Sequence, residues 1–373
     1  MPKKYRIAAI GFAHVHMDST LELFAECKDR VEFVAAADIK PKIATLSNEP
    51  GTRNTQLKRA IELYGFKKYD DYEKLLEENQ IDVALVCAEN AYHPEVMEKI
   101  LRKGIHVVVE KPLASSLEGA VRIARASREG GAKVITNWPS AWYPAVRKAK
   151  ELVDSGEIGK LFKFCYRNTD SLGPFSYGQV MTDTEKSREW WYQADTGGGA
   201  MLDYCSYGAC MSCWFTGETP QAAYGLMANF DSPYGSADDY AAITVRFPGA
   251  VALLEGSWTT VSGGVPNGPL LYGLEGTMVV RLNGDVEVYK TRHSEKPDRI
   301  IKADPLPAGR ETLAKETLHH LDTGEPLFPM LDLPLNMSAV SILDSGARSA
   351  KSGKLELVNN GTWCVGDDDQ GNA

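Results

Sequence analysis

The 373-residue chain has no excess of positive charge, since 50 aspartates and glutamates outnumber 41 lysines and arginines and the formal net charge is −9. Binding to nucleic-acid phosphates needs a basic face, so this balance argues against a nucleic-acid partner. The chain also lacks an apolar run long enough to cross a lipid bilayer. Its short N-terminal apolar run has no cleavage site after it and does not resemble a signal peptide. We expect neither a nucleic-acid nor a membrane partner.

The sequence has only seven cysteines, an odd number that does not suit a disulfide framework. Cys87, Cys165 and Cys205 lie inside apolar segments, which is typical of buried thiols in a reducing compartment. Cys210 and Cys213 have the spacing of a metal-binding pair, but no second pair accompanies them, and we interpret them as buried helix thiols. These features predict a cytoplasmic protein.

The first third of the chain alternates short apolar runs with amphipathic segments, which is the pattern of parallel strands joined by crossover helices. The runs are rich in Val, Ile and Ala without alternation, which indicates strands covered on both faces. Ser115 and Glu118 have the spacing of a helix capping box. The predicted strands cover residues 5–11, 31–38, 81–87, 106–110 and 133–137, and the predicted helices 20–27, 57–64, 72–78, 94–102 and 117–128.

After residue 137 the pattern changes to strands with more polar alternation, which indicates an antiparallel or mixed sheet. Two late helical segments are expected to pack back against this sheet or against the first domain. We therefore predict an α/β protein with a Rossmann domain over residues 1–137, a doubly wound parallel sheet, and a second α/β domain over 138–373. In the second domain the predicted strands cover 241–247, 251–258 and 277–282, and the predicted helices 145–155, 311–323 and 335–350.

The first predicted strand runs through a glycine into a helix, which is where a Rossmann fold binds a pyrophosphate at a helix N-terminus. Only Gly11 of the Gly-x-Gly-x-x-Gly pattern is present, with Ala13 and His16 at the later places. The second strand ends in Asp38, whose carboxylate suits an adenosine ribose and would repel a 2'-phosphate, so NAD is favoured over NADP. Alternatively, Asp38 only caps the next turn. The expected cofactor-binding residues at these two strand ends are Gly11, Phe12, Ala13, His14, His16 and Asp38.

The pair His14 and His16 also has a second interpretation, because His-x-His after a first strand begins the metal site of barrel-type hydrolases. Such a site needs further His and Asp ligands at later strand ends. The other histidines do not follow strands in that rhythm; they are His93, His106, His293, His319 and His320. We therefore predict loop histidines near a phosphate and no metal, with the metal hydrolase kept as an alternative.

Several later segments resemble the glucose-fructose oxidoreductase, inositol dehydrogenase and MocA family (Gfo/Idh/MocA). They are DVALVCAENAYHP at 82–94, LRKGIHVVVEKPLA at 101–114, GEIGK at 156–160 and GGGAMLD at 197–203. The Glu110-Lys111-Pro112 step is their most specific part, and the similarity extends to about residue 358. The resemblance implies NAD(P) on the Rossmann domain, and a second domain whose open, predominantly antiparallel sheet forms a substrate pocket and often an oligomer interface.

The family pattern also assigns residues to the cofactor and the substrate. It places Asn90 and His93 beside the cofactor and Glu110 and Lys111 near the nicotinamide. It implies a sugar, inositol or glycoside as substrate, and a homo-oligomer such as a dimer, tetramer or hexamer formed through the second sheet. We expect the substrate to contact Lys111, Asn137, Trp138, Arg167, Asp203 and Tyr207.

Family members usually carry Asp-x-x-x-His on the helix after the glycines, but here the pair is Asp203 and Tyr207, so the usual base is missing. Lys111 follows a strand at the carboxyl edge of the sheet, where a lysine can stabilise an alkoxide. Tyr207 could be the base if the Lys111 ammonium favours its phenolate. Asp203 could instead be the base or orient the lysine, or Tyr207 could only pack while Lys111 and Asp203 relay the proton. These alternatives stay open, with Lys111, Asp203 and Tyr207 as the candidate catalytic residues.

The main prediction is an NAD-dependent oxidoreductase that moves a hydride between the nicotinamide and a CH–OH carbon of a sugar, inositol or glycoside. One alternative is a glycoside-processing enzyme whose bound NAD is recycled. Another is a dinucleotide-binding sensor without catalysis, suggested by the missing histidine and the reduced glycine pattern.

Overall fold

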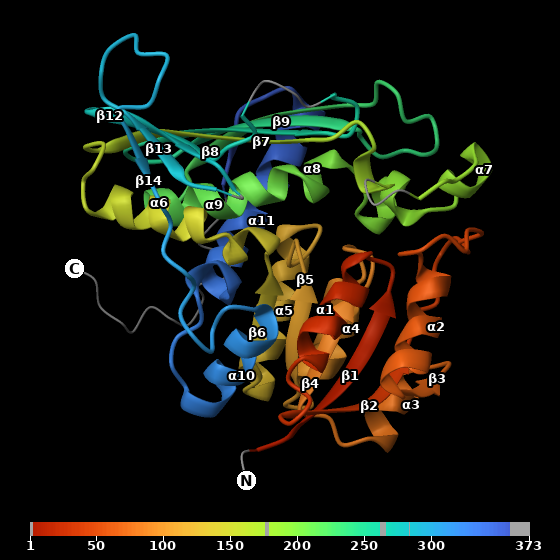
Figure 1. Ribbon diagram of the computed structural model, residues 1–373. Helices are drawn as coiled ribbons and strands as arrows, with labels where there is room; N and C mark the ends of the chain where they lie inside the picture. Colours follow the sequence, from red (N-terminus) through yellow and green to blue (C-terminus); the bar gives the residue numbers. More distant parts are fainter. Residues whose placement is uncertain (1–2, 176–178, 262–265, 283, 359–373) are drawn as a thin grey trace.

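The computed structural model describes residues 3–175, 179–261, 266–282 and 284–358. Figure 1 shows two layered domains, with the red and orange N-terminal strands and helices below and a broad sheet above. The predicted second domain runs to residue 373, so its last part, 359–373, lies outside the described residues. Among the described residues, no helix has both the length and the apolar character that a membrane crossing requires.

The N-terminal sheet has six parallel strands in the order β3-β2-β1-β4-β5-β6. This is the strand order of a dinucleotide-binding Rossmann fold, and it confirms the predicted doubly wound sheet. The sequence analysis missed β3, whose three residues are mostly exposed and form no apolar run. The strands are β1 Tyr5–Phe12, β2 Val31–Ala37, β3 Lys67–Tyr69, β4 Val83–Cys87, β5 His106–Glu110 and β6 Val134–Asn137.

The helices of this domain are those predicted, but some begin elsewhere. α1 begins at His16 and α2 at Arg53, earlier than predicted, and neither start has a capping side chain that would mark it in the sequence. The cap of α5 is Ser116, which accepts a hydrogen bond from the Gly119 amide, and not the predicted Ser115. The helices are α1 His16–Ala25, α2 Arg53–Tyr64, α3 Tyr72–Glu78, α4 His93–Leu101 and α5 Leu117–Gly130.

The second sheet has nine strands in the order β14-β13-β12-β11-β7-β10-β9-β8-β15. Among the described strands of this second sheet, only β7 and β10 pair in parallel, and the other pairs are antiparallel. The predicted mixed, mostly antiparallel sheet is therefore confirmed. Its strands are β7 Leu161–Thr169, β8 Ala222–Ala228, β9 Tyr240–Arg246, β10 Val251–Ser257, β11 Leu270–Gly273, β12 Gly276–Val280, β13 Val286–Tyr289, β14 Arg299–Ile301 and β15 Glu356–Leu357.

Helices fill the space between the second sheet and the first domain (Figure 1). α11 packs on β8 and α9 of the second domain and on α5 of the first, and α10 packs on α1. β8 and α11 approach so closely that a Cβ on Gly225 would lie 2.1 Å from the Gly346 carbonyl oxygen. The helices are α6 Pro144–Asp154, α7 Asp183–Lys186, α8 Ala200–Asp203, α9 Cys205–Thr216, α10 Leu313–Thr323 and α11 Leu333–Ser352, with short 3-10 turns at Pro139–Trp142, Gly173–Phe175, Trp190–Tyr192, Ala194–Thr196 and Pro329–Leu331.

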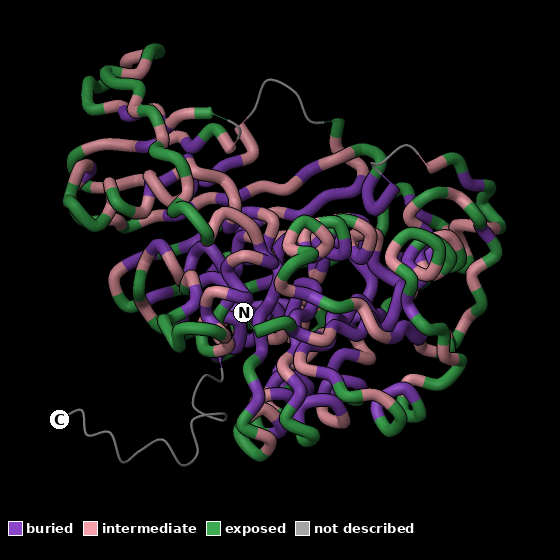
Figure 2. Tube along the Cα trace, turned by 60° about the horizontal axis from the view of Figure 1, so that its bottom comes forward, coloured by how far each residue is buried: buried purple, intermediate pink, exposed green. Residues whose placement is uncertain are grey.

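The largest cluster of buried apolar side chains contains residues of both domains, from Ile7 of β1 to Ile243 of β9 and Ile342 of α11. Figure 2 shows the buried segments gathered at the centre of the molecule, with exposed segments around them. The two domains therefore share one continuous core, and polar residues at their junction are held between packed surfaces.

One hydrogen bond in this junction can be tested directly. The indole nitrogen of Trp138, just after β6, donates to Asn336 Oδ1 of α11 at 2.7 Å, and Trp138 is 1% exposed. We expect Trp138→Phe to lower the free energy of unfolding by about 2–4 kcal/mol, because it leaves a buried acceptor unpaired and removes packed atoms. Urea unfolding measures this loss.

Trp142→Phe is the matched control, because the Trp142 indole nitrogen is buried without a hydrogen-bond partner among the described residues. This variant should lose about 1 kcal/mol or less, since no hydrogen bond is broken. Equal losses in the two variants would show that the Trp138 hydrogen bond does not stabilise the junction.

Candidate active site

A polar cavity of about 320 Å³ lies where the carboxyl ends of β1 and β5 meet α8 and α9 of the second domain. Ligands of doubly wound folds bind at this edge of the parallel sheet. Residues of both domains form the cavity wall, so its shape depends on how the domains dock. The wall includes His14, His16 and Lys111 from the first domain and Asn168, Asp203 and Tyr207 from the second.

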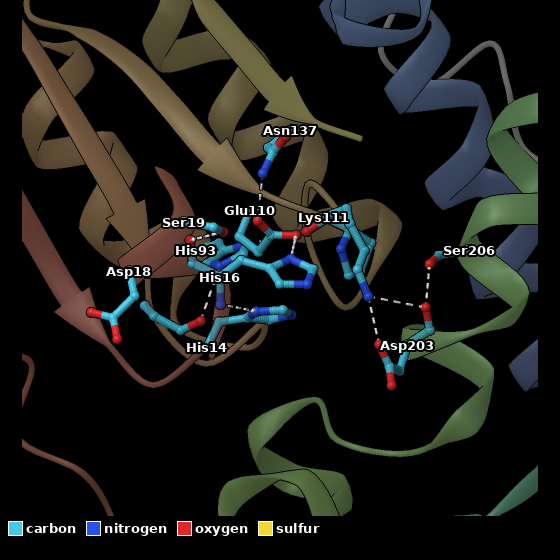
Figure 3. Close-up of polar contacts among 12 residues, drawn as sticks. His14, His16, Asp18, Ser19, His93, Glu110, Lys111, Asn137, Asp203 and Ser206 are labelled. Carbon is cyan, nitrogen blue, oxygen red and sulfur yellow. Dashed lines mark hydrogen bonds and ion pairs between the residues drawn. The ribbon is translucent and has the colours of Figure 1, made fainter. Parts of the chain in front are cut away.

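A buried ion pair joins the two sides of this cavity. Lys111 directly follows β5 and is 2% exposed, and its Nζ donates to Asp203 Oδ1 at 2.5 Å and to the Asp203 carbonyl at 3.2 Å (Figure 3). The other carboxylate oxygen accepts a hydrogen bond from Trp258 Nε1 at 3.2 Å. Asp203 thus has a partner on each oxygen, which is the condition under which a buried charge pair is tolerated.

Tyr207 contributes its ring to the surroundings of Lys111. The Lys111 Nζ lies 4.9 Å from the centre of the ring, in a cation–π arrangement. The ring packs edge-on against Trp138 at 5.5 Å and parallel to Tyr166 at 6.4 Å between ring centres. The helix predicted to carry both residues is broken, because α8 ends at Asp203 and α9 begins at Cys205, yet both side chains still reach Lys111.

Glu110 and His16 form a second polar pair beside the lysine. His16 Nδ1 lies 3.0 Å from Glu110 Oε1, and Asn137 Nδ2 donates to the other carboxylate oxygen at 3.0 Å (Figure 3). Burial raises the pKa of the Glu110 carboxyl, but His16, Lys111 and Asn137 together outweigh burial and hold this pKa below its usual value. Glu110 is therefore an ionised group that anchors His16 at the cavity.

His14 stands next to His16 with its ring centre 4.7 Å from that of Trp191. Its Nδ1 accepts the His16 backbone N–H at 3.2 Å, whereas its Nε2 is buried without a hydrogen-bond partner among the described residues. Burial lowers the pKa of His14 well below its usual value, and the neighbouring His16, Lys111 and His93 side chains lower it further. His14 is therefore a neutral imidazole.

The ligand-capable atoms of His14, His16 and Glu110 all lie within 4.8 Å of one another. The sequence analysis sought a third metal ligand among the histidines alone and so overlooked Glu110, which stands at the end of β5. Folding brings the ends of β1 and β5 together. The spacing between His14 and Glu110 in the sequence does not indicate that these two residues meet.

Asn90 and His93, which the family resemblance placed beside the cofactor, are both buried in the junction. The His93 ring nitrogens lie 3.2 Å from the carbonyl oxygens of Pro112 and Ala88, so this side chain braces the segment after β5 and is not among the residues that line the cavity. Asn90 Nδ2 donates to the Gly197 carbonyl at 2.8 Å and ties the end of β4 to the glycine turn. The contacts of His93 in the structure are structural, and its place beside a cofactor stays a prediction.

Asp38 caps a turn and also lines a cavity, and its contact with a ribose stays a prediction. Its Oδ1 accepts the backbone N–H groups of Phe12 at 2.9 Å and Ile39 at 2.8 Å, which caps the turn after β2. Arg53 Nη1 donates to both carboxylate oxygens at 2.8 Å, and its other terminal nitrogen pairs with Glu89. Asp38 also lines a cavity of about 370 Å³ at the end of β2, where a Rossmann fold holds adenosine. Arg53 was not predicted, because it meets Asp38 only through the fold.

The residues present fit the two ends of a dinucleotide. Asp38 would offer a carboxylate to an adenosine ribose, and the Lys111–Asp203 pair would hold the nicotinamide end. Between them, Gly11 at φ 77° is required, because a Cβ there would lie 2.9 Å from the Ala88 Cα. In this structure Gln56 holds the loop, since its Nε2 donates to the His14 carbonyl at 3.0 Å and its Oε1 accepts the Asp18 amide of α1 at 3.2 Å. A pyrophosphate at the start of α1 would compete with Gln56 for that amide.

Two of the predicted substrate residues lie elsewhere. Side chains alternate along β7, so Tyr166 faces α9 and Arg167 faces the opposite side of the sheet, where it pairs with Glu255 at 2.6 Å. Arg167 is thus not at the cavity, contrary to the prediction, while its neighbour Asn168 is. Trp138 is a core residue behind Tyr207 and is not part of the cavity wall.

Asn137 lines a neighbouring cavity along α1 and contacts the site through Glu110. The structure adds Trp258 and Asn267, two loop residues of the second domain that the sequence analysis did not single out. Neither lies in a motif, so no signal in the sequence marks them.

The fold and the site together define a two-domain oxidoreductase with a dinucleotide-binding Rossmann domain. Residues 6–138 match the model of an oxidoreductase family with an NAD-binding Rossmann fold, and residues 146–279 match the GFO/IDH/MocA C-terminal domain. The two matches together cover more than half of the chain. The chain belongs to the Gfo/Idh/MocA oxidoreductase family.

Curated relatives share the chemistry of sugars and related rings. The chain is 31% identical over 188 residues to dTDP-3,4-didehydro-2,6-dideoxy-alpha-D-glucose 3-reductase of Actinomadura kijaniata, covering 48% of this chain and 53% of that protein. It is 26% identical over 216 residues to 1,5-anhydro-D-fructose reductase of Ensifer adhaerens, covering 58% and 61%. The chain thus spans about half the length of the curated relatives it matches.

Solved structures show the same fold over nearly the whole chain. The aldose-aldose oxidoreductase of Caulobacter crescentus, in complex with glycerol, has a TM-score of 0.74 at 19% identity and covers 95% of this chain and 100% of its own. The WlbA dehydrogenase of Bordetella pertussis, in complex with NADH and UDP-GlcNAcA, has a TM-score of 0.73 at 18% identity and covers 95% and 99%.

The Lys111–Asp203 ion pair predicts a pattern of stabilities. Lys111→Met leaves a buried carboxylate without its cation, and we expect the free energy of unfolding to fall by about 3–5 kcal/mol. The double variant Lys111→Met/Asp203→Asn should recover a large part of this loss, because the remaining amide is neutral and still accepts from Trp258. Urea unfolding of the three proteins measures both effects.

Lys99→Met is the matched control, because Lys99 pairs with Glu73 at 2.7 Å on the exposed surface. It should cost less than about 1 kcal/mol. A similar cost for Lys111→Met and Lys99→Met would contradict the burial of the pair.

Proposed function

We propose that the protein transfers a hydride between a nicotinamide cofactor and a CH–OH carbon of a sugar, inositol or glycoside. The observation that carries this proposal is the buried Lys111–Asp203 pair, which stands in a polar cavity at the carboxyl edge of a Rossmann sheet. A cation fixed at that edge is suited to an oxygen that becomes negative as a hydride leaves its carbon.

In the proposed reaction, the cofactor and each residue of the site have a distinct role. The nicotinamide, when bound, supplies the hydride acceptor or donor. Lys111 hydrogen-bonds the reacting oxygen. As the hydride leaves, the Lys111 ammonium gives one proton to Asp203 and takes the hydroxyl proton in return, so the lysine stays charged and stabilises the developing alkoxide. Because the ammonium faces the ring of Tyr207, we assign Tyr207 to the wall of the site and not to the proton path.

The chemistry of the cavity wall supports a polyhydroxylated substrate. Asn168, Thr169, Asp170 and Asn267 offer amide, hydroxyl and carboxylate groups to a ligand with several hydroxyls. Trp191 adds an aromatic surface of the kind that packs on the C–H face of a sugar ring. The names of the relatives agree with this class of substrate.

We propose NAD as the cofactor in preference to NADP. Asp38 brings a negative charge to the cavity at the end of β2, and a 2'-phosphate there would be repelled. Arg53 lies nearby, but Asp38 and Glu89 already pair with its guanidinium. The local charge around the ribose position is therefore acidic.

We also propose a homo-oligomer assembled through the outer face of the second sheet. On this face β8 and β10 expose apolar side chains, with Tyr224 and Leu253 at 41% and Leu226 at 54% exposure. An apolar face of this kind is typical of protein interfaces.

The six described cysteines are free thiols, which supports a cytoplasmic location.

The proposal predicts turnover and a specific mutational pattern. We expect the purified protein to produce NADH with at least one member of a panel of sugars, inositols and glycosides, and to prefer NAD over NADP. Lys111→Met should lower kcat by about 10²- to 10³-fold, because it removes the charge that stabilises the alkoxide. Tyr207→Phe should stay within about tenfold of wild type, with an unchanged pH profile of kcat.

Absorbance of NADH at steady state measures these rates. A Tyr207→Phe variant as slow as Lys111→Met would place the phenol in the proton path. Product formation without net NADH would instead favour the glycoside-processing enzyme with recycled NAD. The absence of turnover with every compound of the panel would favour the non-catalytic sensor.

The oligomer proposal has its own test. Leu253→Glu places a charge in the middle of the exposed apolar face, and we expect it to yield monomers, because burying an unpaired carboxylate costs several kcal/mol. Size-exclusion chromatography with light scattering measures the mass. Leu63→Glu is the control, since Leu63 is 59% exposed on α2 of the first domain and should leave the mass unchanged. A monomeric wild-type protein would refute the proposal.

A further inference from the structure

The imidazole of His14 carries a hydrogen-bond donor that has no acceptor among the described residues. His14 is 2% exposed, and its Nδ1 accepts the His16 backbone N–H at 3.2 Å. A neutral imidazole has one N–H, so the proton must lie on Nε2. This Nε2 is buried and has no hydrogen-bond partner among the described residues. An unpaired buried donor costs about 1–3 kcal/mol, so it calls for a ligand that pairs with it.

The surroundings of His14 identify the kind of ligand. His14 lines the same cavity as Lys111 and Asp203, and Figure 3 shows its ring on the side of the site where the lysine meets the aspartate. A donor on this wall, beside a second donor of positive charge, suits an oxygen atom of the ligand, and best an oxygen that gains negative charge. The reacting oxygen of a carbinol or ketone has this property.

A metal ion is the competing occupant, because two histidines and a carboxylate form a common ligand set. The ligand-capable atoms of His14, His16 and Glu110 lie within 4.8 Å of one another. However, a metal on His14 Nε2 would require the proton on Nδ1, where it would meet the N–H of His16. The nearby Lys111 ammonium would also repel a cation. The tautomer and the charge therefore both favour an oxygen ligand.

We propose that His14 is a catalytic residue whose Nε2–H donates a hydrogen bond to the reacting oxygen of the substrate. This inference rests on the proposed function and adds a second donor to it. Lys111 and His14, one charged and one neutral, hold the same oxygen while the C–O bond becomes C=O. The hydride would go to the bound cofactor, Lys111 would take the hydroxyl proton while passing one of its own to Asp203, and His14 would keep its proton throughout. The first domain would thus supply a neutral imidazole to a site in which position 207 is a tyrosine.

The tautomer can be observed without any turnover. Long-range 1H–15N correlation spectra of 15N-histidine-labelled protein report which ring nitrogen carries the proton, and His14→Gln assigns the signal. We expect a neutral His14 with the proton on Nε2 throughout pH 6–8, since its pKa is far below its usual value. A proton on Nδ1, or a stoichiometric divalent metal in the purified protein that His14→Phe releases, would overturn the proposal.

Kinetics test the catalytic role, with the best substrate of the panel. We expect His14→Phe to lower kcat by about 10²-fold, as for other single donors to a developing oxyanion. The Kd for NADH, measured by fluorescence, should change less than about threefold. His14→Gln retains an N–H donor and should restore part of kcat. His319→Phe is the control, since His319 pairs with Glu325 at the exposed surface and should retain full activity.

The outcomes separate the two proposals. If the wild-type protein turns over and His14→Phe is equally fast, the role of His14 is refuted while the proposed function stands. If the wild-type protein turns over nothing in the panel, the proposed function fails. The spectra then decide alone, because a His14 Nε2–H signal that does not shift when myo-inositol or D-glucose is added with NADH would refute the donor role.

Discussion

The buried ion pair between Lys111 and Asp203 lies in the wall of the site and joins the two domains. Lys111 belongs to the end of β5 in the first domain and Asp203 to the end of α8 in the second, and both are almost fully buried. A buried charge without its partner destabilises a protein by several kcal/mol, so each of these charges is tolerated only when the domains are docked. Docking of the domains and formation of the site are therefore one event.

Other contacts across the junction obey the same constraint. Asn90 binds the glycine turn, Trp138 binds α11, and Trp190 Nε1 donates to the Ala13 carbonyl at 2.9 Å. Each bond satisfies a polar group that would be buried without a partner if the domains shifted by a few ångströms. The walls of the cavity are thus fixed by packing and by hydrogen bonds, which is how a preorganised site holds its donors in place before a substrate arrives.

The sequence predicts the framework well and the partners poorly. Runs of Val, Ile and Ala mark the buried parallel strands, and the residues at their ends, Asp38 and Lys111, are predictable as site candidates because ligands bind at that edge. Arg53 and Trp258 could not be predicted, since they meet Asp38 and Asp203 only through tertiary structure. Arg167 illustrates another limit, because a strand turns each side chain to the opposite face from its neighbour, and the sequence did not fix which face meets the site.

Tyr207, at the place where the family resemblance led us to expect a histidine, contributes its ring to the packing around Lys111. A phenol ring face stabilises a desolvated ammonium by about 1–2 kcal/mol, so Tyr207 helps to keep Lys111 in place beside Asp203. With Lys111 and the two loop histidines at its rim, the first domain brings the nitrogen donors, and the second domain brings the carboxylate, the aromatic wall and the polar side chains. Under the proposed function, Lys111 and His14 of the cofactor domain would hold the reacting oxygen, while Asp203 and the polar side chains of the second domain would complete the site around the substrate.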